Sequence, residues 1–419
     1  MFQTNCAMKN KFLLEMQSRG YLNQCTDLDN LGQICDKKSI SAYIGFDCTA
    51  NSLHVGSLLQ IMILKLMQKH GHRPIVLLGG GTTLIGDPSG KDNTRKILEQ
   101  KEINNNIRSI KKVFNKILDT SNKNTKPVFV DNAVWLTKLN YIQFLRDIGS
   151  HFTINKMLTF DSVNLRLGRE QSLSYIEFNY MILQAYDFYQ LYKTKSCILQ
   201  IGGSDQWGNI VNGVELIRRM LQKESYGLTS PLITLASGAK MGKTEKGAIW
   251  LNEDLFSSYN YWQFWRNTDD RDVKRFLNYF TEIESSEIDR IVEEEKNINN
   301  LKIILANEAT KILHGKVASD KANQTAKETF EKGGLSSGLP EIKIKSSEIM
   351  RDIDILDFLS NSKIMSSKSE ARRAIANKGL KIDNVVVSDD KKKIKLSDFK
   401  KNVLKISYGK KKHYIVKII

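Results

Sequence analysis

Short apolar runs alternate with stretches of helical periodicity through the first half of the chain. Residues 73–80 read RPIVLLGG, an almost continuous apolar run that is typical of a strand buried on both faces. Similar runs occupy residues 41–47, 126–132 and 197–203. Residues 56–70 carry apolar side chains at helical spacing, and Gly71 suits the end of that helix. This alternation predicts an α/β fold with a doubly wound parallel sheet, on which ligands lie beyond the carboxyl ends of the strands.

The second half of the chain has a different pattern. Residues 253–333 look mainly helical with mixed charge, and residues 330–348 are rich in glycine and serine, which predicts a linker. The 419 residues suffice for two or three domains. We therefore expect four parts, with a sheet domain at 1–250, a helical domain at 251–333, a linker at 334–350 and a small module at 351–419.

Positive charge is concentrated at the carboxyl end of the chain. The net charge is +17, and residues 351–419 hold 18 lysines and arginines against 8 aspartates and glutamates. This small part of the chain therefore carries over half of the excess charge, which predicts a polyanionic partner, most simply a nucleic acid. The alternative is a basic surface that only keeps the protein in solution.

Composition argues against membrane, secreted and metal-binding classes. No apolar run approaches the ~20 residues of a membrane helix, and the first residues lack the apolar segment of a secretory signal. The five cysteines form an odd, dispersed set without metal-type spacing. We expect reduced, mostly buried thiols, a cytoplasmic location and no permanently bound metal.

Three segments after predicted strands have the chemistry of an anion or nucleotide site. His54, Val55 and Gly56 lie where a strand meets a helix, a place that attracts phosphate, and Thr49 just upstream adds a hydroxyl donor. Residues 81–91, GTTLIGDPSGK, suit an anion loop but lack P-loop spacing. Residues 199–209 combine two glycines with Asp205 and Gln206, which can hydrogen-bond hydroxyl groups.

Two further segments add polar groups and cations. Tyr180, Gln184 and Asp187 share one face of a predicted helix, as in a pocket for a small polar ligand. Lys240 and Lys243 surround Gly242 in a predicted loop that can close over a phosphate chain. Each motif alone also occurs as an ordinary turn or a solvated helix edge, so the interpretation depends on the set.

Together these segments resemble a class I aminoacyl-tRNA synthetase, with HVGS as its first signature and KMGKT as its second. The ordered series YIGFDCTANSLHVGS, LIGDPSGKDNTR, EFNYMILQAYD, QIGGSDQWGN and KMGKT is similar to that of bacterial-type tyrosyl-tRNA synthetases. The resemblance is densest over 41–250. It implies a Rossmann-like catalytic domain at 1–250 with a helical dimerisation insert near 133–170, a helical anticodon-side domain, and a small α+β RNA-binding module.

The resemblance also implies roles for individual residues. Tyr43 and Asp187 would hydrogen-bond the phenolic hydroxyl of tyrosine, Tyr180 and Gln184 would hold its ammonium group with Asp87 nearby, and Gln200 and Gln206 would face the amino acid and its carboxyl group. The ATP site would comprise Asp47, His54, Gly56, Ser57, Gly202, Asp205, Met241 and Lys243. Thr49 and His54 would bind the γ-phosphate, and an electrostatic clamp would comprise Lys91, Arg95, Lys240, Lys243 and Thr244.

Two positions depart from the usual signatures. The family usually has histidine, or sometimes asparagine, where this chain has Ser57, so a water would have to bridge the shorter hydroxyl to the ribose. Gly242 and Thr244 differ from the consensus KMSKS, although KxGKT is a familiar form in this family. Residues 356–387 resemble a small RNA-binding fold, in which Lys368, Arg372, Arg373 and Lys378 would contact phosphates.

The implied reaction is the activation of L-tyrosine by ATP, followed by transfer to the terminal adenosine of tRNA(Tyr), with Mg²⁺ entering on ATP. A homodimer is implied as well. Three other interpretations remain open: a tryptophan-specific relative, a small-molecule nucleotidyltransferase with an HxGx signature, and an RNA-binding protein with an inactive catalytic domain.

Overall fold

The computed structural model describes residues 9–87, 98–170, 172–238, 241–244, 247–331, 339, 341–349, 352–400, 402–409 and 412–419. It separates into two compact units, each described by itself: Met1–Phe256 with Thr268–Leu313, and Ser257–Asn267 with His314–Ile419. Among the described residues, none of the helices combines the length and the apolar character needed to cross a membrane.

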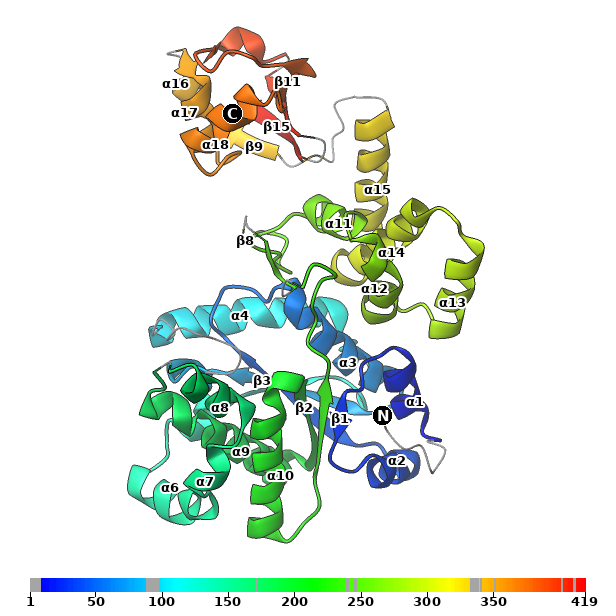
Figure 1. Cartoon of the computed structure of the whole chain (residues 1–419), viewed down its shortest axis with the longest axis vertical. Coiled ribbons are helices and arrows are strands. Elements are labelled where there is room, and N and C mark those ends of the chain that lie inside the picture. The colour runs from blue at the N-terminus through cyan, green and yellow to red at the C-terminus, as the bar shows by residue number, and fades with distance from the viewer. Residues whose placement is uncertain are drawn as a thin grey trace. The chain divides into compact units, whose positions relative to one another are not determined.

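The first unit is built on a mixed sheet with the strand order β1-β6-β5-β2-β3-β4 (Figure 1). Its strands are β1 (Gln24–Cys25), β2 (Ser41–Asp47), β3 (Arg73–Gly79), β4 (Val128–Asp131), β5 (Cys197–Gly203) and β6 (Tyr226–Ser230). All neighbours are parallel except the edge pair β1–β6. The predicted parallel α/β sheet is confirmed, and the four predicted strands are β2 to β5.

The strand order places a topological switch point between β2 and β5. From β2 the chain proceeds outward to β3 and β4, and it then returns to the other side of β2 as β5 and β6. Connections that leave two adjacent parallel strands in opposite directions open a crevice at their carboxyl ends. Here those ends are Asp47 and Gly203, so this crevice lies among the predicted site residues.

Helices pack against the sheet because their apolar faces match it. α3 (Leu58–Lys69) follows the short 3₁₀ turn η1 (Val55–Ser57) and buries most of its side chains, and Gly71, at φ +79°, follows its end. α9 (Tyr175–Lys195) starts at a capping box in which Ser174 and Glu177 satisfy each other's backbone N–H groups. The remaining helices of this unit are α1 (Lys11–Ser18), α2 (Leu28–Lys37), α4 (Gln100–Ile117), α5 (Ala133–Leu136), α6 (Tyr141–Asp147), α7 (Ile154–Met157), α8 (Asp161–Gly168), α10 (Trp207–Leu221), α12 (Val273–Phe280), α13 (Ser285–Glu294) and α14 (Ile298–His314).

The second unit contains a helix pair and a small α+β module. α11 (Ser258–Arg266) packs against α15 (Lys316–Glu331). The module holds the sheet β12-β11-β14-β15-β9 and the pair β10–β13. Its elements are β9 (Glu341–Ile344), α16 (Ser346–Ile349), β10 (Ile353–Asp354), α17 (Ile355–Asn361), α18 (Lys368–Ala376), β11 (Leu380–Ile382), β12 (Val385–Val386), β13 (Lys393–Ile394), β14 (Val403–Tyr408) and β15 (Lys412–Ile418).

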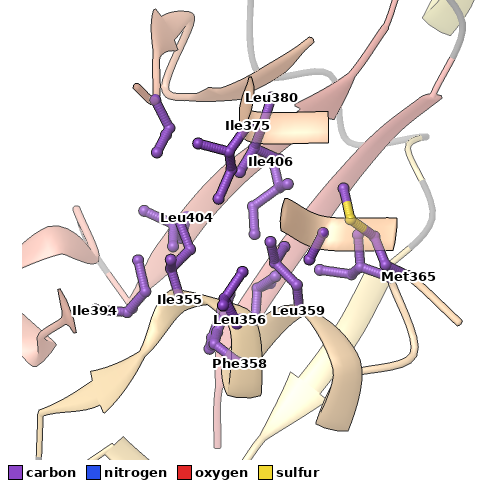
Figure 2. Packing of buried hydrophobic residues seen from close by; sticks show 14 of the residues in the cluster. Ile355, Leu356, Phe358, Leu359, Met365, Ile375, Leu380, Ile394, Leu404 and Ile406 are labelled. Carbon is purple, nitrogen blue, oxygen red and sulfur yellow. The ribbon is translucent and has the colours of Figure 1, made fainter. Parts of the chain in front are cut away.

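An apolar core holds this module together. Leu404 and Ile406 of β14 face Ile355 and Leu359 of α17, with Ile375 of α18 in the same cluster (Figure 2). Part of the predicted linker 334–350 belongs to this core, because β9 pairs in parallel with β15 and buries Ile344. Glycine and serine in the preceding stretch suggested a linker, whereas the alternating sequence EIKI at 341–344 is the pattern of a strand. The four domain boundaries themselves stay predictions.

Candidate active site

A cavity of about 500 Å³ opens at the carboxyl ends of β2 and β5. It gathers predicted residues that lie up to 163 positions apart in the sequence, from Tyr43 to Gln206. The predicted residues that line it are Tyr43, Asp47, Thr49, His54, Gly56, Ser57, Asp87, Tyr180, Gln184, Asp187, Gln200, Gly202, Asp205 and Gln206. The structure therefore brings together most of the predicted site, although the role of each residue stays a prediction.

Most residues of the predicted electrostatic clamp lie outside the residues that the structure describes. Lys91, Arg95 and Lys240 lie outside the described residues. Lys243 and Thr244 form the short strand β7 (Lys243–Thr244), which pairs with β8 (Gly247–Ala248), and their side chains are likewise outside it.

Asp187 is a buried carboxylate held by two donors. Its side chain is 1% exposed, and its oxygens accept hydrogen bonds from Nδ2 of Asn132 at 2.8 Å and from Nε1 of Trp135 at 2.7 Å. Burial raises the pKa of Asp187 to about 7, against the lowering effect of these two hydrogen bonds. Asp187 is therefore oriented, and its negative charge calls for a further donor.

Three buried polar atoms beside the cavity have no hydrogen-bond partner in the described structure, and one of them is Oε1 of Gln60. The other two are the hydroxyl of Tyr43, which is 1% exposed, and Oε1 of Gln200, which is 2% exposed. Burial, with the nearby charge of Asp187, raises the pKa of Tyr43 well above its usual value, so its hydroxyl stays protonated. Buried polar atoms without partners are costly, so these two groups suit a bound polar ligand.

Asp47 is fixed at the end of β2 by hydroxyl groups from two other elements. Tyr180 donates to its Oδ2 at 3.2 Å, and Thr82 donates to its Oδ1 at 2.9 Å. Asn132 in turn donates to Oγ1 of Thr82 at 3.0 Å and to Asp187. A chain of hydrogen bonds therefore links the carboxylates of Asp187 and Asp47.

Asn132, Trp135 and Thr82 were not predicted as site residues. Asn132 and Trp135 follow directly after β4, and Thr82 follows β3 in the 3₁₀ turn η2 (Thr82–Leu84). Their position just after predicted strands could have identified them as site residues, because the carboxyl ends of parallel strands meet at one edge of a sheet.

Amide side chains form a second hydrogen-bond network at the cavity. Gln206 lies in the 3₁₀ turn η4 (Ser204–Gln206) and donates to Oδ2 of Asp87 at 3.1 Å. Asn209 donates both to Oε1 of Gln206 at 3.0 Å and to Oε1 of Gln184 at 3.1 Å. These bonds hold three of the predicted tyrosine-site residues in one network.

The two signature segments lie side by side. The backbone N–H of Val55 donates to the carbonyl of Ile249 at 2.8 Å, and His54 forms an antiparallel bridge with Trp250. Met241 is buried, and its carbonyl oxygen would lie 2.8 Å from a Cβ on Gly56. Gly56 lines the cavity, and a Cβ at this position would also lie 2.7 Å from Cε1 of the His54 ring, so its predicted part in the ATP site stays a prediction.

The predicted RNA-binding cations are exposed on the small module. Lys368 and Arg372 on α18 pair with Asp357 at 2.5 Å and with Asp390 at 3.1 Å. Arg373 and Lys378 are exposed as well. Exposed ion pairs of this kind are weak, so all four cations can serve a polyanion.

The chain matches known families over almost all of its length. The family described as "tRNA synthetases class I (W and Y)" matches residues 36–331, and the "Tyrosine--tRNA ligase SYY-like C-terminal domain" matches residues 331–416. The tyrosine–tRNA ligase of Pelagibacter ubique is 60% identical over 98% of this chain and 100% of its own length. That of Rhodopseudomonas palustris is 51% identical over 98% and 99%.

A solved structure agrees with these matches. A C-terminally truncated mitochondrial tyrosyl-tRNA synthetase from Aspergillus nidulans superposes with a TM-score of 0.69 at 29% identity, covering 77% of this chain and 95% of that one. The matches span the sheet unit, with its buried Asp187 and paired signatures, as well as the small module. The chain therefore belongs to the bacterial-type tyrosyl-tRNA synthetases of class I.

Proposed function

We propose that this chain activates L-tyrosine with ATP and transfers it to the 3′-terminal adenosine of tRNA(Tyr). The observation that carries the proposal is that different polar groups line the two ends of the cavity. One end holds the oriented Asp187 carboxylate and the unpartnered Tyr43 hydroxyl, and the lining extends to His54 beside the second signature. A phenol at one end and a polyphosphate at the other match this arrangement.

Selection for tyrosine follows from the buried end. The phenolic hydroxyl of tyrosine donates to Asp187 and accepts from Tyr43, so Tyr43 gains the partner that it lacks and Asp187 gains a third donor. Phenylalanine fills the same volume but leaves the Tyr43 hydroxyl unpaired and gives Asp187 no further donor, at a cost of about 1–3 kcal/mol for a buried polar group without a partner. A tryptophan indole has no oxygen to accept from Tyr43, which argues against the tryptophan-specific interpretation.

The first step needs position and charge stabilisation rather than a base. A carboxylate oxygen of tyrosine attacks the α-phosphorus while the bond to the bridging oxygen breaks, and pyrophosphate leaves with the electron pair. Thr49 and His54 donate to the departing phosphates, with the ammonium groups of Lys240 and Lys243, so their loss lowers kcat more than it raises KM. Asp205 serves the ribose, and Tyr180, Gln184 and Asp87 serve the ammonium group of tyrosine.

Mg²⁺ enters with ATP and neutralises phosphate charge there. The described residues include no group of three or more His, Cys, Asp or Glu side chains arranged to hold a metal ion. Mg²⁺ in nucleotide sites takes most of its ligands from substrate phosphates and water. In the second step the tRNA ribose hydroxyl takes the tyrosyl group and AMP is released.

The small module supplies affinity for tRNA through phosphate contacts. Lys368, Arg372, Arg373 and Lys378 lie exposed there, and the family match over 331–416 covers the module. Because such contacts release counterions, tRNA binding weakens steeply with salt. We also place the enzyme in the cytoplasm, a location that the free cysteines Cys25, Cys35, Cys48 and Cys197 suit.

We further propose a homodimer formed through the helical insert near 133–170. Large apolar side chains are exposed along it, among them Ile142 at 70%, Ile154 at 64% and Tyr141 at 59%. Apolar side chains that cluster on a surface mark an interaction site. Sedimentation velocity tests this: the wild type is expected as a dimer, and a monomer at micromolar concentration would contradict it.

The experiment that tests the catalytic proposal is ATP–pyrophosphate exchange with each of the twenty amino acids. We expect exchange with tyrosine alone, and loss of tyrosine affinity in Asp187→Ala. Exchange driven by tryptophan, by another amino acid or by none would reject the assignment. A variant Asp187→Ala with wild-type affinity and selectivity would reject the pocket.

A further inference from the structure

The backbone of the second signature lies against the ring of His54, and Gly242 makes this approach possible. An ideal Cβ on Gly242 would lie 2.5 Å from Nδ1 of His54, 3.0 Å from its Cε1 and 3.1 Å from the backbone nitrogen of Gly56. Real Cβ atoms essentially never come closer than 3.0 Å to such atoms. Any side chain at position 242 must therefore displace either the ring or the segment.

The ring of His54 is also held by a hydrogen bond within its own segment. The backbone N–H of Gly56 donates to Nδ1 of His54 at 3.0 Å. Because Nδ1 accepts this bond, the neutral imidazole carries its proton on Nε2. Nε2–H is then the ring group that can donate to a phosphate oxygen.

The segment cannot simply retreat from the ring. The N–H of Ile249 donates to the carbonyl of Gly242 at 3.2 Å, and the N–H of Val55 donates to the carbonyl of Ile249 at 2.8 Å. The N–H of Met241 also donates to the carbonyl of Ile233 at 3.1 Å. These main-chain bonds tie residues 241 and 242 to the segment that carries His54, so a new side chain would push mainly on the ring.

We propose that Gly242 is a positioning residue for His54 in the activation of tyrosine. Its missing side chain lets the second signature support the imidazole ring, which keeps Nδ1 bonded to the Gly56 N–H and the proton on Nε2, the nitrogen that donates to the departing phosphate. This inference rests on the phosphate-binding role proposed for His54.

The chain offers a matched control for Gly242. Gly242 has φ +107° and Gly247 has φ +116°, so an alanine at either position bears similar backbone strain. A Cβ on Gly247, however, would meet no heavy atom of the described residues within 4 Å. The difference between Gly242→Ala and Gly247→Ala therefore isolates the contact with His54.

The test is tyrosine-dependent ATP–pyrophosphate exchange by the full-length chain. We expect Gly242→Ala to lower kcat about tenfold more than Gly247→Ala does, with the KM for tyrosine unchanged. In a His54→Ala background the two alanine variants should differ no longer, because the group through which Gly242 acts is gone. Equal effects of the two variants in the wild-type background, or an undiminished difference without His54, would overturn the inference.

Two further measurements keep the inference testable if Gly242→Ala does not fold. Gly56→Ala places a Cβ 2.7 Å from Cε1 of His54, against the same ring, and should show the same loss that depends on His54. Long-range proton–nitrogen NMR on the wild type, with His54→Ala for assignment, should show the Nε2–H tautomer at neutral imidazole. The Nδ1–H tautomer would overturn the inference.

The proposed function fails in a different way. If His54→Ala leaves kcat unchanged, the phosphate-binding role of His54 is wrong. If His54→Ala lowers kcat about a hundredfold while Gly242→Ala matches Gly247→Ala, only the positioning role is wrong.

Discussion

The affinity for tyrosine should rise with pH between 6 and 8, because the carboxylate that receives the phenol titrates in this range. Burial raises the pKa of Asp187 to about 7 in the ligand-free enzyme. The phenolic hydroxyl is a donor, so it favours the ionised carboxylate and binds the protonated form poorly. The bound tyrosine itself keeps its charge state over this interval.

The size of the effect follows from the ionised fraction of Asp187. With a pKa of about 7, about a tenth of the ligand-free enzyme carries the ionised carboxylate at pH 6 and about nine-tenths at pH 8. If tyrosine selects the ionised form, its Kd falls about tenfold between these pH values and then levels off.

Isothermal titration calorimetry, with tyrosine titrated into the enzyme at a series of pH values, measures this pH dependence of the Kd. Asp187→Asn is the control, because its amide does not titrate and it should bind more weakly with a flat pH profile. A wild-type Kd that stays constant from pH 6 to pH 8, or that rises with pH, would refute the reasoning about Asp187.

Further predictions concern stability, the hydrogen-bond chain, the insert and the module. Relative to Asp187→Asn, the ligand-free wild type should lose about 3 kcal/mol of unfolding free energy as pH rises from 4 to 7, since the folded pKa of about 7 exceeds the unfolded value of 3.8. Urea unfolding at a series of pH values measures this loss, and a pH-independent difference between the two proteins would contradict it. Thr82→Val removes the donor to Asp47 and should lower kcat for exchange about tenfold, whereas Thr82→Ser retains it; equal activity of the two variants would show that the bond has no effect. Ile142→Glu should shift the dimer toward monomer in sedimentation velocity, and an unchanged dimer would place the interface elsewhere. Arg373→Ala should weaken tRNA binding and reduce the slope of log K against log salt concentration by about one. An unchanged slope would show that Arg373 does not contact a tRNA phosphate.

The parts of the fold that depend on local periodicity were predictable from the sequence. The strands at 41–47 and 197–203 coincide with β2 and β5, because a strand buried on both faces reads as a continuous apolar run. Neither β1 nor β6 was predicted. The β6 sequence YGLTS at 226–230 contains glycine and hydroxyl residues, so it does not have the apolar pattern of a buried strand, although all five residues are buried. The strand β9 was read as linker because it follows a glycine-rich stretch.

The site was predictable where a motif or a resemblance marked it. Asn132, Trp135 and Thr82 have no such mark, because their roles come from hydrogen bonds to Asp187 and Asp47 that join positions far apart in the sequence. Gly56 was predicted from its place in the first signature, and its part in ATP binding stays a prediction. Its small size accommodates the His54 ring and a carbonyl of the second signature, a contact that only the folded chain reveals.

The most direct test of the account is a crystal structure of the enzyme with a non-hydrolysable tyrosyl-adenylate analogue. We predict that the phenolic oxygen lies at about 2.7–3.0 Å from both the Tyr43 hydroxyl and the Asp187 carboxylate, with the phosphate toward His54 and the second signature. A phenol bound away from Asp187, or an adenylate on the far side of the sheet from both signatures, would contradict the account.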